Sequence, residues 1–119
     1  MAYVDGFVVP VPKRKRRAYV AMARKACKVW KDHGALDYRE CVADDVSWGK
    51  RTSFPRSVKL KKSEEVWFSW IVYRNRKHRD AVMKKVMKDK RLASMMDVKS
   101  LPFDAKRMIF GGFKVVVDL

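Results

Sequence analysis

The sequence predicts an α+β protein in which a four-stranded antiparallel sheet carries two helices on one face. The main evidence is the order of its periodic segments: apolar residues repeat every two positions in four segments and every three or four positions in two, in the order β-α-β-β-α-β. This is the order of the ferredoxin-like split motif. A chain of 119 residues with 48% hydrophobic content suffices for one domain with a core. We therefore expect a single domain over residues 1–119, with an insertion at about 43–64.

The most apolar segment is EEVWFSWIVY, at residues 64–73. It is too short to cross a membrane as a helix, and its aromatic and β-branched residues predict a central strand buried on both faces. We expect Trp67 and Ile71 to face the helices, and Phe68 and Trp70 to face the other way. One small domain has nothing left to cover that second face except the insertion. The pattern therefore predicts a homodimer in which two sheets close into a barrel-like layer.

The first half of the chain contains two of the other strands and the first helix. YVDGFVV, at residues 3–9, alternates as a strand does, and Pro10 and Pro12 are expected to end it because proline cannot donate to a ladder. Residues 13–33 show an apolar stripe at helical spacing. Residues 35–42 alternate again and predict the second strand.

The remaining elements lie before and after the central strand. The insertion contains turn residues and one predicted helical turn near 55–58. The second helix is predicted over 75–89, beginning at a capping asparagine. A loop with a short helical piece around 93–96 leads to the last strand, 107–117. Its Gly111-Gly112 pair indicates a bulge or a close backbone approach.

The charge of the chain is unusual. It has 29 Lys and Arg against 13 Asp and Glu, a formal net charge of +16. Such a charge attracts polyanions, and nucleic acid is the obvious class; the alternative is a surface that is merely solvated. Basic residues form matching stripes on the outer sides of both predicted helices, so we expect non-specific polyanion binding there. The stripes comprise Arg17, Arg24, Lys28, Lys31, Lys77, Lys84, Lys88 and Arg91.

A candidate pocket is predicted on the sheet face away from the helices, where aromatic side chains would surround two carboxylates. A carboxyl group among aromatic rings suits a general base or a ligand anchor, because burial raises its pKa. The alternative is purely structural: Asp5 and Glu40 would pair with Arg39, Arg107 or Lys114 across the dimer. The predicted pocket comprises Tyr3, Asp5, Phe7, Tyr38, Glu40, Phe68, Trp70 and Phe110.

No pattern for a metal or a cofactor is present. Cys27 and Cys41 are too few for a disulfide framework and lack zinc-ligand spacing with His33 or His78. The chain contains no phosphate-binding loop and no nucleophile motif. We expect reduced thiols, no cofactor, no metal, no membrane contact and a cytoplasmic location. The sequence indicates no enzyme class.

Several segments together resemble the YbaA-like family, a bacterial family of unknown function (domain of unknown function 1428). The resemblance covers nearly the whole chain, and it implies the dimeric α+β barrel superfamily, whose members include cofactor-independent monooxygenases and small-molecule-binding proteins. It supplies no catalytic residues. The segments are YVDGFVVPVP, SFPR, FSWIVY, HRDAV, KVM and FDAKRMIFGGF.

The chain also departs from the pattern of that family. It is far more basic in both predicted helices, and Cys27, Met83 and Val98 stand where glycine, asparagine and proline are typical. These departures fit a charge-engineered cationic variant or a natural basic homologue. Three functions remain open: an uncharacterised dimeric barrel protein, a cofactor-free enzyme or small-molecule binder, and a polyanion binder.

Overall fold

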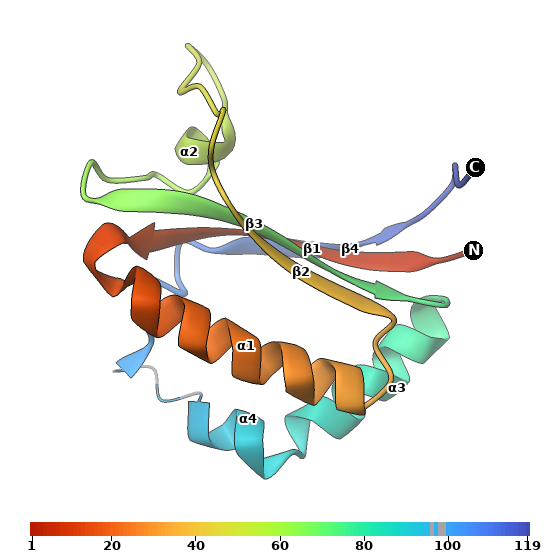
Figure 1. The fold of residues 1–119 in the computed structure, drawn as a ribbon. Helices are drawn as coiled ribbons and strands as arrows, with labels where there is room; N and C mark the ends of the chain where they lie inside the picture. Colours follow the sequence, from red (N-terminus) through yellow and green to blue (C-terminus); the bar gives the residue numbers. More distant parts are fainter. Residues whose placement is uncertain (96, 98–99) are drawn as a thin grey trace.

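The computed structural model describes residues 1–95, 97 and 100–119, and it has the predicted ferredoxin-like α+β fold (Figure 1). Its four strands form one antiparallel sheet in the order β2-β3-β1-β4. The elements are β1 (Tyr3–Pro12), a 3₁₀ turn (Lys13–Lys15), α1 (Arg16–Asp32), β2 (Asp37–Val42), α2 (Phe54–Ser57), β3 (Glu64–Tyr73), α3 (Arg76–Met87), α4 (Lys90–Met95) and β4 (Ile109–Lys114).

The helices α1, α3 and α4 cover one face of the sheet, whereas the insertion containing α2 rises on the other side (Figure 1). The central strands β1 and β3 pair along their whole length, from Tyr3 opposite Tyr73 to Pro12 opposite Glu64. As predicted, Trp67 and Ile71 of β3 belong to the core beneath the helices.

The prediction that proline ends β1 was wrong, because the strand continues to Pro12. The even-numbered residues of β1 direct their backbone groups toward β4, as the bond from the Val115 N–H to the Ala2 carbonyl shows. The pairing with β4 stops at Val8, so the nitrogens of Pro10 and Pro12 lie where there is no neighbouring strand. The ladder loses no hydrogen bond there, and the bonds toward β3 remain intact.

The helices follow the predicted pattern, with small shifts at their ends. The predicted N-cap of α3 is confirmed: the Asn75 side chain accepts a bond from the His78 N–H at 2.8 Å. The short helical piece expected around 93–96 is α4, which begins earlier, at Lys90. Its predicted last residue, Met96, lies outside the described residues.

The glycine pair of β4 marks a close approach. A Cβ at Gly112 would come within 2.2 Å of the Tyr3 hydroxyl oxygen. The register of β4 with β1 is regular from Lys114 to Ile109, so the alternative of a bulge is excluded at this pair. Glycine at position 112 therefore leaves the space that the Tyr3 side chain occupies.

Candidate functional site

The strand register divides the predicted pocket residues between the two faces of the sheet. Glu40 and Phe7 both lie opposite Ser69 of β3, in one row on the helix side, and Tyr38 lies opposite Ile71 in the next row. Phe68 and Trp70 lie on the opposite, open face. The prediction that all eight residues share one face was therefore wrong. On the helix side lie Tyr3, Asp5, Phe7, Tyr38, Glu40 and Phe110.

The division has a simple physical cause. Alternation shows which residues of one strand share a face, but the pairing register decides which faces of two strands coincide. Both faces of this sheet carry aromatic side chains. The hydrophobic pattern alone therefore could not show which face of β2 lies on the same side of the sheet as Phe68 and Trp70 of β3.

A cavity of about 200 Å³ lies between the sheet and the layer of α1 and α4. Apolar side chains from both layers form most of its wall, including Met22, Trp30 and Leu92. The polar side chains of Glu40 and Ser69 line the same cavity from the sheet.

Glu40 is held by two tyrosine hydroxyl groups from different elements. Tyr19 of α1 donates to its Oε1 at 2.8 Å, and Tyr38 of β2 donates to its Oε2 at 3.0 Å. Burial raises the pKa of Glu40, although the two hydroxyl donors act in the opposite direction. Burial and the carboxylate of Glu40 also raise the pKa values of both tyrosines, which therefore stay protonated donors at neutral pH.

The carboxylate retains capacity for a ligand. It has about four acceptor positions, of which the tyrosines use two. Ser69 is buried beside it, and its hydroxyl has no hydrogen-bond partner among the described residues. The cavity thus offers acceptors and a free donor within an apolar wall.

The second predicted carboxylate, Asp5, is bound in a structural cluster away from this cavity. Its Oδ1 lies 3.3 Å from Arg79 Nη1, and Arg79 also donates to the Tyr3 hydroxyl at 3.2 Å. Burial raises the pKa of Asp5, and the charge of Arg79 opposes that shift. Asp5 therefore pairs with Arg79 of its own chain. Neither predicted alternative, a carboxyl group in the pocket or an ion pair across the dimer, described this arrangement.

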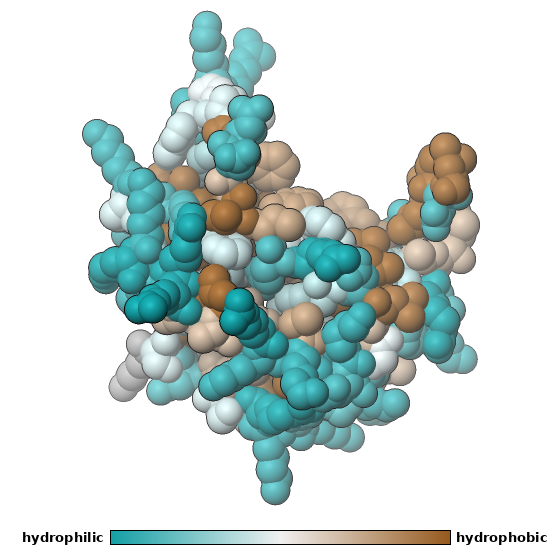
Figure 2. All heavy atoms as spheres, in the orientation of Figure 1, coloured by the Kyte–Doolittle hydropathy of each residue, from teal (hydrophilic) through white to brown (hydrophobic). Residues whose placement is uncertain are grey.

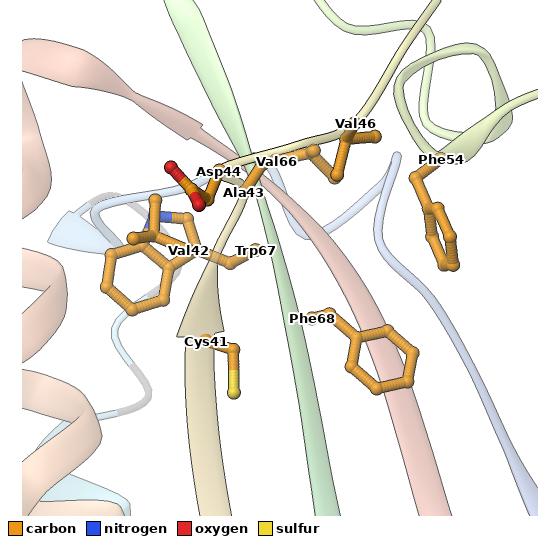
Figure 3. A pocket seen from close by; sticks show the side chains of 9 residues that line it. All are labelled: Cys41, Val42, Ala43, Asp44, Val46, Phe54, Val66, Trp67 and Phe68. Carbon is orange, nitrogen blue, oxygen red and sulfur yellow. The ribbon is translucent and has the colours of Figure 1, made fainter.

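The open face of the sheet is apolar and only partly covered: Val58 and Leu60 of the insertion pack on Val8 and Val66. Phe68 is 40% exposed and Phe113 is 65% exposed. At one corner of this face, β2, β3 and the insertion enclose a pocket of about 210 Å³, where the rings of Phe54 and Phe68 meet edge to face at 5.7 Å (Figure 3). The thiol of Cys41 lies beside Phe68 in this pocket (Figure 3).

All eight residues of the predicted basic stripes are exposed, but not all are free. Lys28 lies 3.6 Å from Asp32, and Arg91 forms ion pairs at 2.8 Å with Asp32 and with Asp89. In the part of the chain that the structure describes, no ion pair is found for Arg17, Arg24, Lys31, Lys77, Lys84 or Lys88.

Across the described residues, no group of three side chains could hold a metal ion. Nor is any described helix long and apolar enough to span a membrane.

Comparison with known proteins identifies the family. Residues 2–105 match the family model described as "Protein of unknown function (DUF1428)". The chain is 50% identical over 118 residues to the "Uncharacterized protein YbaA" of Escherichia coli K12, covering 99% of each chain, and equally so to that of Shigella flexneri. The chain belongs to the DUF1428 family.

No function is established for this DUF1428 family, so the site must be interpreted from its chemistry. Among solved structures, the "De novo designed protein Foldit4" is 12% identical, with a TM-score of 0.47 over 97% of this chain and 99% of that one. This likeness is too slight to support an argument.

Two residues of the candidate site were not singled out from the sequence. Tyr19 belongs to the apolar stripe of the first predicted helix, and Ser69 carries no pattern of its own within the central strand. The available signal was the hydroxyl group itself, since a buried tyrosine hydroxyl usually needs a hydrogen-bond partner. Tyr19 finds that partner in Glu40.

Proposed function

We propose that the chain binds a small, single-ring organic molecule in the cavity between α1, α4 and the sheet. The observation that carries this proposal is the Glu40 carboxylate, which lines an apolar cavity with acceptor positions unused. Pockets that combine an apolar wall with a few convergent polar groups are typical ligand sites. The proposal concerns binding and assigns no reaction.

The size of the cavity limits the ligand. A dry apolar cavity of about 150 Å³ accommodates benzene, whereas drug-sized ligands occupy about 300 Å³ or more. The cavity of about 200 Å³ therefore suits one ring with one or two substituents.

The chemistry of Glu40 selects the substituent. A carboxylate held by two donors can accept a third bond from a ligand hydroxyl or amino group, and hydrogen bonds to charged groups contribute about 1.5–3 kcal/mol. Phenols and anilines carry such donors, whereas plain hydrocarbons do not. The free hydroxyl of Ser69 adds a second contact for a polar substituent.

Phenol and toluene form a matched pair of probes, because they have similar shape but differ in the donor. Calorimetric titration of the wild-type protein should show phenol binding about tenfold more tightly than toluene, as one charged hydrogen bond implies. The Glu40→Gln variant keeps an acceptor oxygen but loses the charge, so it should reduce the preference for phenol. Equal affinity of phenol and toluene in the wild type would make Glu40 a purely structural group. Binding of neither probe at millimolar concentration would remove the cavity proposal.

The open face supports a second proposal, that the protein is a homodimer in which two copies cover each other's sheets. Apolar side chains of β3 and β4 are exposed there. The C-terminal segment, which contains the exposed Val116 and Val117, ends on the side away from the helices (Figure 1). Contiguous exposed apolar surface of this kind marks interaction sites. The cationic helices lie on the other side of the sheet, so two copies joined in this way keep their charges apart (Figure 1).

Sedimentation equilibrium tests the dimer. Phe68→Lys places a charge in the middle of the open face and should give a monomer at micromolar concentration. Met87→Lys is the control, since Met87 is 58% exposed on α3, outside that face. A wild-type monomer would refute the proposal, and so would equal effects of the two variants.

Two further proposals concern the setting of the protein. Cys27 and Cys41 are free thiols, which supports a reducing compartment and therefore the cytoplasm. The matching basic stripes on two separate helices support the hypothesis that the charge was engineered, which stays a prediction.

A further inference from the structure

The positive charge of the chain is concentrated in the layer of helices. α1 contains six Lys or Arg residues and one Asp, α3 contains five and one, and α4 contains two and none. Figure 2 shows hydrophilic side chains gathered over this layer, in the lower half of the view. The helix layer therefore presents a cationic face that is separate from the apolar open face.

The two carboxylates of these helices neutralise little of that charge. Asp32 binds Lys28 and Arg91, and Asp80 binds Arg76 and Arg79. Arg91 also pairs with Asp89, and Arg79 also pairs with Asp5, so these two clusters are close to neutral. The net positive charge of the layer comes from the other Lys and Arg residues of the helices.

A hollow in the cationic face lies where the end of α1 meets the start of α3. Its volume is about 460 Å³, and its lining includes Arg74, Lys77, Lys85 and both histidines of the chain. No carboxylate lines it, and no ion pair with a described carboxylate is found for these three cations. Burial, followed by the charges of Arg74 and Lys85, lowers the pKa of His78. Arg74, Lys77 and Lys85 therefore give the hollow a positive charge, and the nearby carboxylate of Asp89 pairs with His33 at 2.8 Å.

We propose that this hollow and the helix surface beside it bind the phosphate backbone of a nucleic-acid duplex. Unpaired Lys and Arg side chains around a concave surface suit phosphate oxygens, and the positive end of the α3 dipole adds to the attraction. Neutralising phosphates releases counterions, which supplies the binding free energy without sequence recognition.

The absence of aromatic side chains on this face favours a duplex over a single strand. Single-strand-binding proteins stack bases on exposed aromatic rings. In the described chain, the large aromatic side chains that are exposed belong to the insertion, β3 and β4: Trp48, Phe54, Phe68, Phe110 and Phe113. Tyr19 and Trp30 of α1 face the core instead.

Fluorescence anisotropy with a labelled 20-base-pair duplex of mixed sequence tests the proposal. If the hollow and its surroundings contact about five phosphates, log K should fall with log salt at a slope of about −4.5. Affinity should then fall about 500-fold between 50 and 200 mM salt. Neutralising the hollow with Arg74→Gln, Lys77→Gln and Lys85→Gln should leave about two contacts and reduce that loss to about 12-fold.

The control removes the same charge elsewhere. Lys50→Gln, Arg51→Gln and Lys62→Gln are exposed changes in the insertion, and they should leave the salt slope unchanged. Equal effects of the two triple variants would show attraction to net charge alone and would overturn the site. Two other results would also overturn the proposal: no binding at 50 mM salt, or equal binding of a single strand of the same length.

Discussion

Arg107 links three parts of the chain that are far apart in sequence. Its guanidinium donates to both carboxylate oxygens of Glu64 at the start of β3, to Asp104 at 2.8 Å, and to the carbonyl of Lys59 in the insertion at 3.0 Å. The side chains of Arg107 and Glu64 are 17% and 5% exposed. Removing the guanidinium with Arg107→Met should therefore leave a buried carboxylate without its cation.

The expected cost is about 3 kcal/mol, the lower end of the range for breaking a buried ion pair, because Arg107 retains some contact with water. Unfolding entropy scales with length, so for a chain of 119 residues each kcal/mol corresponds to about 4 °C in the melting temperature. Arg107→Met should thus lower the melting temperature by about 12 °C, measured by circular dichroism at pH 7.

Two further variants separate burial from pairing. Arg16→Met breaks a similar two-pronged bond, between Arg16 and Glu65. Arg16 is 54% exposed and Glu65 is 13% exposed, so the melting temperature should fall clearly less than in Arg107→Met. Adding Glu64→Gln to Arg107→Met removes the unpaired charge and should recover part of the loss. If Arg16→Met proves as costly as Arg107→Met, burial does not decide the magnitude and the reasoning fails.

Three more predictions concern stability. Arg107 holds the folded pKa of Glu64 below its ordinary 4.5, so this stabilisation is complete above pH 4.5 and is lost as the pH falls through the lowered value. In Arg107→Met, burial without the cation raises that pKa, so in urea unfolding the contribution of Glu64 should change sign and favour the folded state as the pH falls. Gly112→Ala should cost about 1–3 kcal/mol, since its Cβ would overlap Tyr3; a melting temperature equal to the wild type would contradict this close approach. Asn75→Ala should lower the free energy of unfolding by about 1 kcal/mol, while Asn75→Asp, which keeps a capping oxygen, should not.

The fold could be predicted from the sequence because each element carries its own periodic pattern. The two apolar faces of β3 were assigned correctly within that strand, with Trp67 inside and Phe68 outside. The extent of β1 depended on where β4 ends, which is a property of the sheet and not of Pro10. Local pattern therefore determined the elements, while pairing between distant segments determined their ends.

The candidate site was harder to predict, because its parts come from different elements. Glu40 was selected as a buried carboxylate, but it was expected on the open face among Phe68 and Trp70. Its partner Tyr38 was correctly expected on the same face, but its other partner, Tyr19 of the first helix, was separated from it by the choice of face. A change of one residue in the pairing register of β2 with β3 thus moves the Glu40 carboxylate from one face of the sheet to the other.

Adjacent residues of β3 face opposite sides of the sheet, so the proposed ligand site and the proposed dimer surface share this strand. Ser69 lines the cavity on one face, and its neighbours Phe68 and Trp70 lie on the open face. If ligand binding and dimerisation each shift this strand, the ligand changes the dimerisation constant, and dimerisation changes the ligand affinity by the same factor. Ligand titrations should therefore be repeated over a range of protein concentrations, because a dissociation constant that drifts with concentration would measure the linkage directly.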